Sequence, residues 1–314
     1  MKYKPIPLDG IKTYPLKSRT SKVGVAAFAR PVPNGPSFTD FLDCLPKILA
    51  GENFAHAVQS IVKAHSSAKP VIWAMGAHVI KCGLSPIIIQ LMEKGIISAV
   101  ALNGAGIIHD FELACIGQTS EDVEVQLQEG RFGMAQETGE LLNQAINQGV
   151  AEGLGLGAAV GKYLQKTAPP YIEYSLVAAA YRLDLPLTVH VALGTDIIHI
   201  HPQANGAAIG QGSHLDFRLL SGVIADLEGG GVFINAGSAV VMPEVFLKAV
   251  TLIRNLGQPL NHFTTINLDF MSHYRPMQNI VKRPTGQGGK GYSFIGHHEL
   301  LIPLLAAAVL KELE

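Results

Sequence analysis

The sequence predicts an α/β protein with a doubly wound, mostly parallel, Rossmann-like sheet. Short apolar runs without charge, such as Val71 to Met75, are typical of strands that are buried on both faces of a parallel sheet. These runs alternate with longer segments whose apolar residues have helical spacing. Several of the runs end in glycine or small polar residues, and open α/β sheets bind ligands at that end of their strands.

The N-terminal 40 residues contain many prolines and predict an extended arm, with one strand at Val23 to Phe28. Residues 41–314 are expected to form a single α/β catalytic domain. Phe38 to His65 has apolar stripes at helical spacing and predicts mostly helix.

The stretch from Val71 to Asp110 predicts a βαβ unit. A helix begins at Ser85 and Pro86 and ends at Gly95, and Ile96 to Leu102 forms the second strand. Backbone N–H groups in the following glycine-rich loop can approach a phosphate or ribose closely. The cofactor-binding candidates in this unit are Gly76, His78, Asn103, Gly104, Ala105, Gly106 and Asp110.

His109 and Asp110 follow the glycine-rich loop, and two interpretations stay open for them. They contact cofactor and substrate, or Asp110 is the N-cap of a helix from Phe111 to Ile116. The two roles are compatible.

The later part of the chain repeats the order of strand, small or polar loop and helix. Helices are expected at 134–148, 171–181, 217–227 and 243–254, and strands at 187–193, 232–235 and 263–268. The glycine-rich stretch from Gly153 to Lys162 follows a helix rather than a strand, so a helix face of small residues is favoured over a phosphate loop.

The composition excludes several classes of function. A net charge of -1 with no run of like charges predicts no nucleic-acid partner and no membrane partner. The three cysteines, without a CxxC pair, favour a reducing cytoplasm over a disulfide framework. The low charged fraction of 16% with 48% hydrophobic residues indicates subunit contacts.

Histidine is concentrated between residues 190 and 214. If Asp196 to Pro202 is extended, His199 and His201 face one side and make a two-point metal site, with His214 as one candidate for a third ligand. Alternatively, such histidines form buried hydrogen bonds or line a substrate pocket.

From Val71 to the end, the order of elements resembles deoxyhypusine synthase and its bacterial and archaeal relatives. The resemblance rests on Gly83 before a proline-started helix, Asn103 to Asp110, Ala192 to Asp196, Ala236-Gly237-Ser238, Ile266-Asn267, Arg275-Pro276 and Leu300 to Leu305. It implies an NAD-binding fold, a homotetramer with sites at subunit interfaces, and chemistry on spermidine through imines. By the same resemblance, Asp196 holds the substrate amine, while Gly237, Ser238, Asn267 and Asp269 belong to the cofactor edge.

The chain departs from this family where the family has its catalytic lysine, because Pro284 takes that position. Lys282 is therefore the candidate nucleophile: burial or the neighbouring cation of Arg283 lowers a lysine pKa and allows an imine to form. Lys290 is a weaker candidate, and a solvated Lys282–Arg283 pair is the alternative. His297 and His298 replace the family's closing aspartate and alanine, and they become substrate-binding candidates.

The sequence therefore predicts an NAD-dependent enzyme that acts on a small amine, polyamine or amino acid, with Lys282, Asp196 and His109 as catalytic candidates. Two other classes stay open. One is a metal-dependent hydrolase that uses the histidines between His190 and His214, and the other is a non-catalytic nucleotide-binding protein.

Overall fold

The computed structural model describes residues 3–314, which form two compact units with the boundary between Asn53 and Phe54. The first unit is mostly extended, exposed chain. It contains the short 3-10 helices η1 (Leu16–Ser18) and η2 (Val25–Ala27) and the helix α1 (Phe38–Cys44). The prediction of a strand at Val23 to Phe28 is wrong, because the helix η2 occupies this segment. Within residues 3–53 there is no strand.

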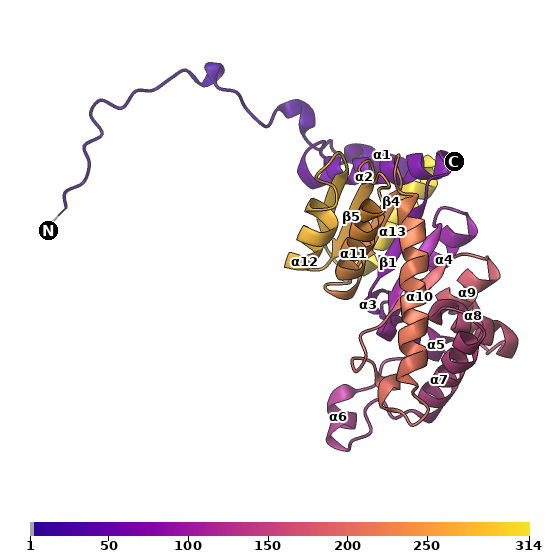
Figure 1. The fold of residues 1–314 in the computed structure, drawn as a ribbon. Coiled ribbons are helices and arrows are strands. Elements are labelled where there is room, and N and C mark those ends of the chain that lie inside the picture. The colour runs from indigo at the N-terminus through magenta and orange to yellow at the C-terminus, as the bar shows by residue number, and fades with distance from the viewer. Residues whose placement is uncertain (1–2) are drawn as a thin grey trace. The chain divides into compact units, whose positions relative to one another are not determined.

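The second unit is built around a six-stranded, all-parallel sheet (Figure 1). The strand order is β3-β2-β1-β4-β5-β6, so the direction of strand addition reverses between β1 and β4. The strands are β1 (Val71–Met75), β2 (Ala99–Asn103), β3 (Leu187–His190), β4 (Val232–Ala236), β5 (Thr264–Asp269) and β6 (Lys290–Ile295). This topology confirms the predicted α/β, Rossmann-like fold.

Helices cover both faces of this sheet. The helices around the βα units are α2 (Leu49–Ser66), α3 (His78–Lys81), α4 (Ser85–Glu93), α5 (Gly104–Ile116), α6 (Val123–Gln128), α7 (Gln136–Ala151), α8 (Leu156–Thr167), η3 (Ile172–Tyr174) and α9 (Leu176–Arg182). The later ones are η4 (Ile197–Ile200), α10 (Gly206–Ala225), α11 (Val241–Asn255), α12 (Tyr274–Pro276), the π-helical segment η5 (Met277–Lys282) and α13 (His298–Glu312). In Figure 1, α10 is the long helix that runs from beside α11 to beside α7.

Successive side chains of β1 point to opposite faces of the sheet. Ile72 and Ala74 pack with α10, α11 and η5 in one apolar core, in which the rings of Phe233 and Phe246 stack with centroids 3.9 Å apart. Trp73 faces the other side, where α2, α4 and α13 supply Ile61, Leu91 and Leu305 among other apolar residues. Because both faces are covered, β1 is buried along its whole length, as its uninterrupted apolar sequence predicts.

From Leu156 onward, the glycine-rich stretch at Gly153 to Lys162 forms the start of α8, which confirms the prediction of a tightly packed helix face. A Cβ at Gly157 would lie 1.9 Å from the Leu187 carbonyl oxygen, and a Cβ at Gly161 would lie 2.7 Å from the Tyr181 Cβ. Lys162 is exposed and pairs with Glu152 at the surface. These glycines therefore bring α8 close to β3 and α9.

Within residues 3–314, no helix combines the length and apolar character that a membrane crossing requires.

Candidate functional site

The strands β1 and β4 touch at their carboxyl ends, where the strand order reverses. A Cβ at Gly76 would lie 2.4 Å from the Gly237 carbonyl oxygen, and Gly237 has a φ of +64°. A Cβ at Gly237 would in turn lie 2.9 Å from Cε1 of His298, a fully buried residue. The two glycines therefore make room for each other and for the His298 ring, which fills the space above them.

The neighbouring polar residues on β4 and β5 are also engaged within the chain. Ser238 Oγ accepts a hydrogen bond from the Met242 N–H at 3.1 Å in the first turn of α11. The Asn235 side chain donates to Asn267 Oδ1 at 2.7 Å, and Asp269 Oδ1 accepts from the N–H of Phe270 at 2.8 Å. This part of the predicted cofactor edge is polar and mostly paired, although Asn235 Oδ1 is buried without a hydrogen-bond partner.

The segment from Gly104 to Asp110 is helical, which corrects the loop predicted there. Asn103 is the N-cap of α5, and its Oδ1 accepts from the Gly106 N–H at 2.9 Å. Ile107, Ile108 and Phe111 are buried in the core at helical spacing. A capping residue and an apolar helix face therefore prevail over the local glycine content.

Asp110 is the cap of a different helix from the one predicted. Its carboxylate accepts hydrogen bonds from Ser175 Oγ at 2.5 Å and from the N–H groups of Leu176 at 2.7 Å and Val177 at 3.2 Å, which begin α9. Asp110 is fully buried, and burial raises its pKa to about 6. In this structure its carboxylate is fully engaged with the start of α9.

Asp216 has the same kind of role on α10. Its Oδ2 accepts from the Val189 N–H at 2.8 Å and from the Gly157 N–H at 3.2 Å at the start of α8. Burial raises its pKa to about 7. Nearby on β3, burial lowers the pKa of His190 to about 4, and the ring lies 3.0 Å from Thr188 Oγ1.

Asp196 and His199 form a pair with unused hydrogen-bonding capacity beside the start of α5. A Cβ at Gly104 would lie 1.9 Å from Asp196 Oδ2, so the absence of a side chain there makes room for the carboxylate. His199 Nδ1 accepts from the N–H groups of Gly194 at 3.0 Å and Asp196 at 3.3 Å, which assigns the ring proton to Nε2. His199 Nε2 is buried without a hydrogen-bond partner and lies 3.9 Å from Asp196 Oδ2.

The pair is shielded from solvent. The side chains of His199 and Asp196 are 6% and 8% exposed, and burial raises the pKa of the Asp196 carboxyl, although His199 lowers it. The donor, His199 Nε2–H, and the acceptor, the Asp196 carboxylate, are too far apart to bond to each other. They are arranged to bind a group that lies between them.

His109 belongs to a chain of hydrogen bonds that the sequence did not predict. Its Nδ1 lies 2.6 Å from Thr119 Oγ1, and the Thr119 hydroxyl donates to Glu112 Oε2 at 2.5 Å. Thr138 Oγ1 donates to the other Glu112 oxygen at 3.0 Å. Burial lowers the pKa of His109, opposed by Glu112 and assisted by Lys81, so its imidazole is neutral near pH 7. Glu112 lies one helical turn after His109, and Thr119 and Thr138 meet it only through the tertiary fold.

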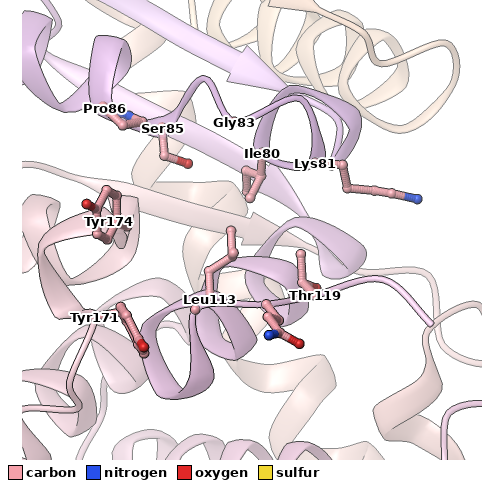
Figure 2. Close-up of a pocket in the computed structure, with 11 residues that line it drawn as sticks. Ile80, Lys81, Gly83, Ser85, Pro86, Leu113, Thr119, Tyr171 and Tyr174 are labelled. Carbon is pink, nitrogen blue, oxygen red and sulfur yellow. The ribbon is translucent and has the colours of Figure 1, made fainter.

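A pocket of about 700 Å³ opens beside this chain, between the α3–α4 segment and the end of α5 (Figure 2). Ser85 Oγ lines it and is buried without a hydrogen-bond partner. The other lining residues are Ile80, Lys81, Gly83, Pro86, Leu113, Gly117, Gln118, Thr119, Tyr171 and Tyr174. Lys81 is the only charged residue among those that line this pocket, so the pocket favours a polar or anionic ligand.

The histidines between 190 and 214 do not converge on one point, so the metal site that was one interpretation of their spacing is wrong. The segment around Ile198 is the 3-10 helix η4 rather than an extended strand. His201 Nε2 bonds to the Gly133 carbonyl oxygen at 2.8 Å, and its ring packs where a Cβ at Gly139 would lie. His214 lies on α10 at a separate pocket of about 570 Å³, which His190 and Glu244 also line.

Lys282 lies at the opposite end of the sheet from Asp196, which corrects its predicted place in the site. It is exposed and ends η5, where the carbonyl of Val281 packs against Gly291 near the start of β6. Lys290 is the exposed first residue of β6 at the same amino end. The π-helical turn carries the chain back across the sheet, a reversal that the spacing after Arg275-Pro276 did not reveal.

A further cluster lies where α3 and α13 begin. Cys82 Sγ lies 3.3 Å from His78 Nε2, and Glu299 lies close to both. The ring of His78 contacts Phe270 and His298, with centroids 5.8 and 5.4 Å apart. His298 is buried and bonds through Nε2 to the Leu268 carbonyl oxygen at 3.2 Å, whereas His297 is exposed.

The fold and its polar carboxyl edge define a Rossmann-like α/β protein, and comparisons with known proteins agree with this class. An Entamoeba histolytica protein assigned as a deoxyhypusine synthase matches with a TM-score of 0.52 and 11% identity, over 90% of this chain and 96% of that chain. A Methanococcus maripaludis S2 protein assigned to the LOR/SDH group matches with a TM-score of 0.51 and 14% identity, over 90% and 73% of the two chains.

The protein AgrE, solved in a ternary complex with ornithine and NAD+, matches with a TM-score of 0.51 and 14% identity. The match covers 84% of this chain, which spans about a third (34%) of AgrE. No family model and no curated protein sequence matches the chain. At these identities the similarities establish the fold.

Proposed function

We propose that the protein is an NAD-dependent enzyme that acts on the carbon–nitrogen bond of a small amino acid. The observation that carries this proposal is the buried Asp196–His199 pair at the carboxyl end of β2. Asp196 offers a carboxylate for an ammonium group, and His199 Nε2–H offers a donor for a carboxylate. An α-amino acid carries both groups, whereas a simple amine satisfies only Asp196.

The pocket in Figure 2 supports the cofactor part of the proposal. Its volume of about 700 Å³ suits one nucleotide half of NAD. Ser85 Oγ would bond to a ribose or phosphate oxygen, Lys81 would pair with phosphate, and Tyr171 and Tyr174 would contact the base. When bound, NAD supplies the acceptor for a hydride from the carbon that bears nitrogen.

His109 is the candidate for moving a proton in this reaction. Its Nδ1–H is directed at Thr119, which is held by Glu112, so Nε2 has the free lone pair. A neutral imidazole fixed in this way can accept a proton from the substrate ammonium group. Glu112 and Thr119 are then positioning residues for His109.

The resemblance of the sequence to deoxyhypusine synthase and the cysteine content support two further parts of the proposal. We expect a homotetramer with sites at subunit interfaces, which sedimentation analysis would test. We also expect a cytoplasmic location, which the three free cysteines favour.

The direct test is calorimetric titration with NAD, followed by a spectroscopic assay for NADH with L-ornithine and with putrescine. Putrescine is ornithine without the carboxylate, so it is the matched control for the role of His199. We expect NAD to bind and ornithine to be favoured over putrescine by at least about tenfold. Equal use of both compounds would contradict the His199 role, and absence of NAD binding would contradict the enzyme class.

The non-catalytic alternative predicts a different result in the same experiment. In that case NAD binds, but neither ornithine nor a wider panel of amino acids yields NADH. The exposed position of Lys282 is the observation that favours this alternative, since it removes the candidate lysine nucleophile from the site.

A further inference from the structure

Three metal-ligating side chains meet at the carboxyl edge of the sheet, away from the Asp196–His199 pair. His78 begins α3 and Cys82 is its C-cap, so the two are one helical turn apart. Glu299 lies in the first turn of α13, which follows β6. The ligand atoms of the three residues lie within 4.8 Å of one another, and no other such group occurs within residues 3–314.

The donor set suits a transition-metal ion rather than Mg²⁺ or Ca²⁺. A thiolate and an imidazole are the ligands that Zn²⁺ prefers, and a carboxylate completes many three-residue zinc sites. The thiolate and the carboxylate together carry two negative charges, which a divalent cation neutralises. On binding, the Cys82 thiol loses its proton to solvent and its sulfur forms the bond to the metal.

The surroundings hold His78 in place while leaving the cluster accessible. The His78 ring packs against the rings of Phe270 and His298, of which His298 is fixed by its bond to the Leu268 carbonyl oxygen. His78 and Glu299 are exposed on their other sides. A metal held by three residues at an exposed position keeps a coordination position open for water or another ligand.

We propose that His78, Cys82 and Glu299 form a binding site for a divalent transition-metal ion, with Zn²⁺ as the preferred ion. The proposal rests on these three side chains alone and does not depend on NAD or on an amino-acid substrate. It also differs in place from the metal site that the sequence predicted, since His199, His201 and His214 take no part in it.

The test is a titration of the metal-free full-length protein with Co²⁺, followed by absorption spectroscopy. A thiolate bound to Co²⁺ gives a charge-transfer band, and we expect this band to saturate at about one ion per chain. Added Zn²⁺ should abolish the band by displacement, whereas Mg²⁺ should not. The absence of a thiolate band would overturn the proposal.

Variants identify the ligands. Cys82→Ser should remove the band, while Cys115→Ser, which alters another partly buried cysteine, should keep it. His78→Asn and Glu299→Gln should each weaken Zn²⁺ binding in competition experiments by more than about tenfold. Circular dichroism of each variant separates loss of a ligand from loss of the fold. A band that survives Cys82→Ser, or that disappears in a folded Cys115→Ser protein, would contradict the assignment.

Discussion

Three carboxylates, those of Asp110, Asp216 and Asp196, are each buried beside the start of a helix. The surroundings of Asp196 differ from those of the other two. Asp110 accepts three hydrogen bonds and Asp216 accepts backbone hydrogen bonds from two separate elements. Asp196 faces Gly104 and lies 3.9 Å from a histidine nitrogen that has no partner. The hydrogen bonds of Asp110 and Asp216 stabilise the fold, whereas we propose that Asp196, beside the unpaired His199 Nε2, binds a ligand.

This difference shows why burial alone does not identify a functional acid. Burial raises the pKa of all three carboxyl groups. What separates Asp196 from the other two is its neighbour, because the buried His199 Nε2 beside it has no hydrogen-bond partner.

The largest effect is expected when a saturated acid is removed. Asp110→Ala leaves the Ser175 hydroxyl and the N–H groups of Leu176 and Val177 unpaired in the core, and we expect a loss of about 4 kcal/mol in the free energy of unfolding. Asp110→Asn keeps an acceptor oxygen and should cost about half as much. Urea denaturation measures both, and equal stability of Asp110→Ala and the wild type would contradict the capping role.

The raised pKa of Asp216 should be visible in the pH dependence of the free energy of unfolding. Its folded-state pKa of about 7 lies above the ordinary value of 3.8, so the folded protein keeps a proton that the unfolded chain has released in this range. The resulting stabilisation is complete below about pH 4 and is lost as the pH rises through about 7. It amounts to about 4 kcal/mol.

The Asp216→Asn variant isolates this effect. His190, with its pKa lowered from 6.5 to about 4, changes stability in the opposite direction between those values, so the total curve mixes the two groups. The difference between the wild type and Asp216→Asn should therefore fall with rising pH between about 4 and 7. A difference that stays constant across this range would contradict the raised pKa.

The smallest effect is expected at Lys282. Its side chain is exposed at the amino end of the sheet, so Lys282→Ala should change the free energy of unfolding by less than about 0.5 kcal/mol. The rate of NADH formation should stay within about twofold of the wild type. A large loss of turnover in a folded variant would bring Lys282 back as the nucleophile.

The sequence predicted the strands β1 to β5 because they are buried on both faces, whereas β6, which is exposed at both ends, was missed. Val71 to Met75 is a strand with these bounds, and a short uninterrupted apolar run between turn residues is typical of a buried strand. The segment after Asn103 was harder to interpret. Its glycines suggested a loop, whereas the Asn103 cap and the buried Ile107, Ile108 and Phe111 start a helix there.

The site was only partly predictable, because its residues meet through contacts that are distant along the chain. Asp196 and His199 were identified as candidates, but the close approach to Gly104 depends on the path of the chain after β3. The relation of His109 to Thr119 and Thr138 also depends on tertiary contacts. His78 and Cys82 show a one-turn spacing in the sequence, yet nothing local indicates that Glu299 joins them.

The measurement that tests the comparison most directly is calorimetric titration of L-ornithine, in the presence of NAD, into the wild type and three variants. Each of Asp196→Asn, Asp110→Asn and Asp216→Asn removes one buried carboxylate with little change in shape. We predict that Asp196→Asn weakens ornithine binding about 30-fold, while the other two stay within about twofold of the wild type. Unchanged binding in Asp196→Asn, or equal weakening in all three folded variants, would contradict the assignment of Asp196 as the open acid.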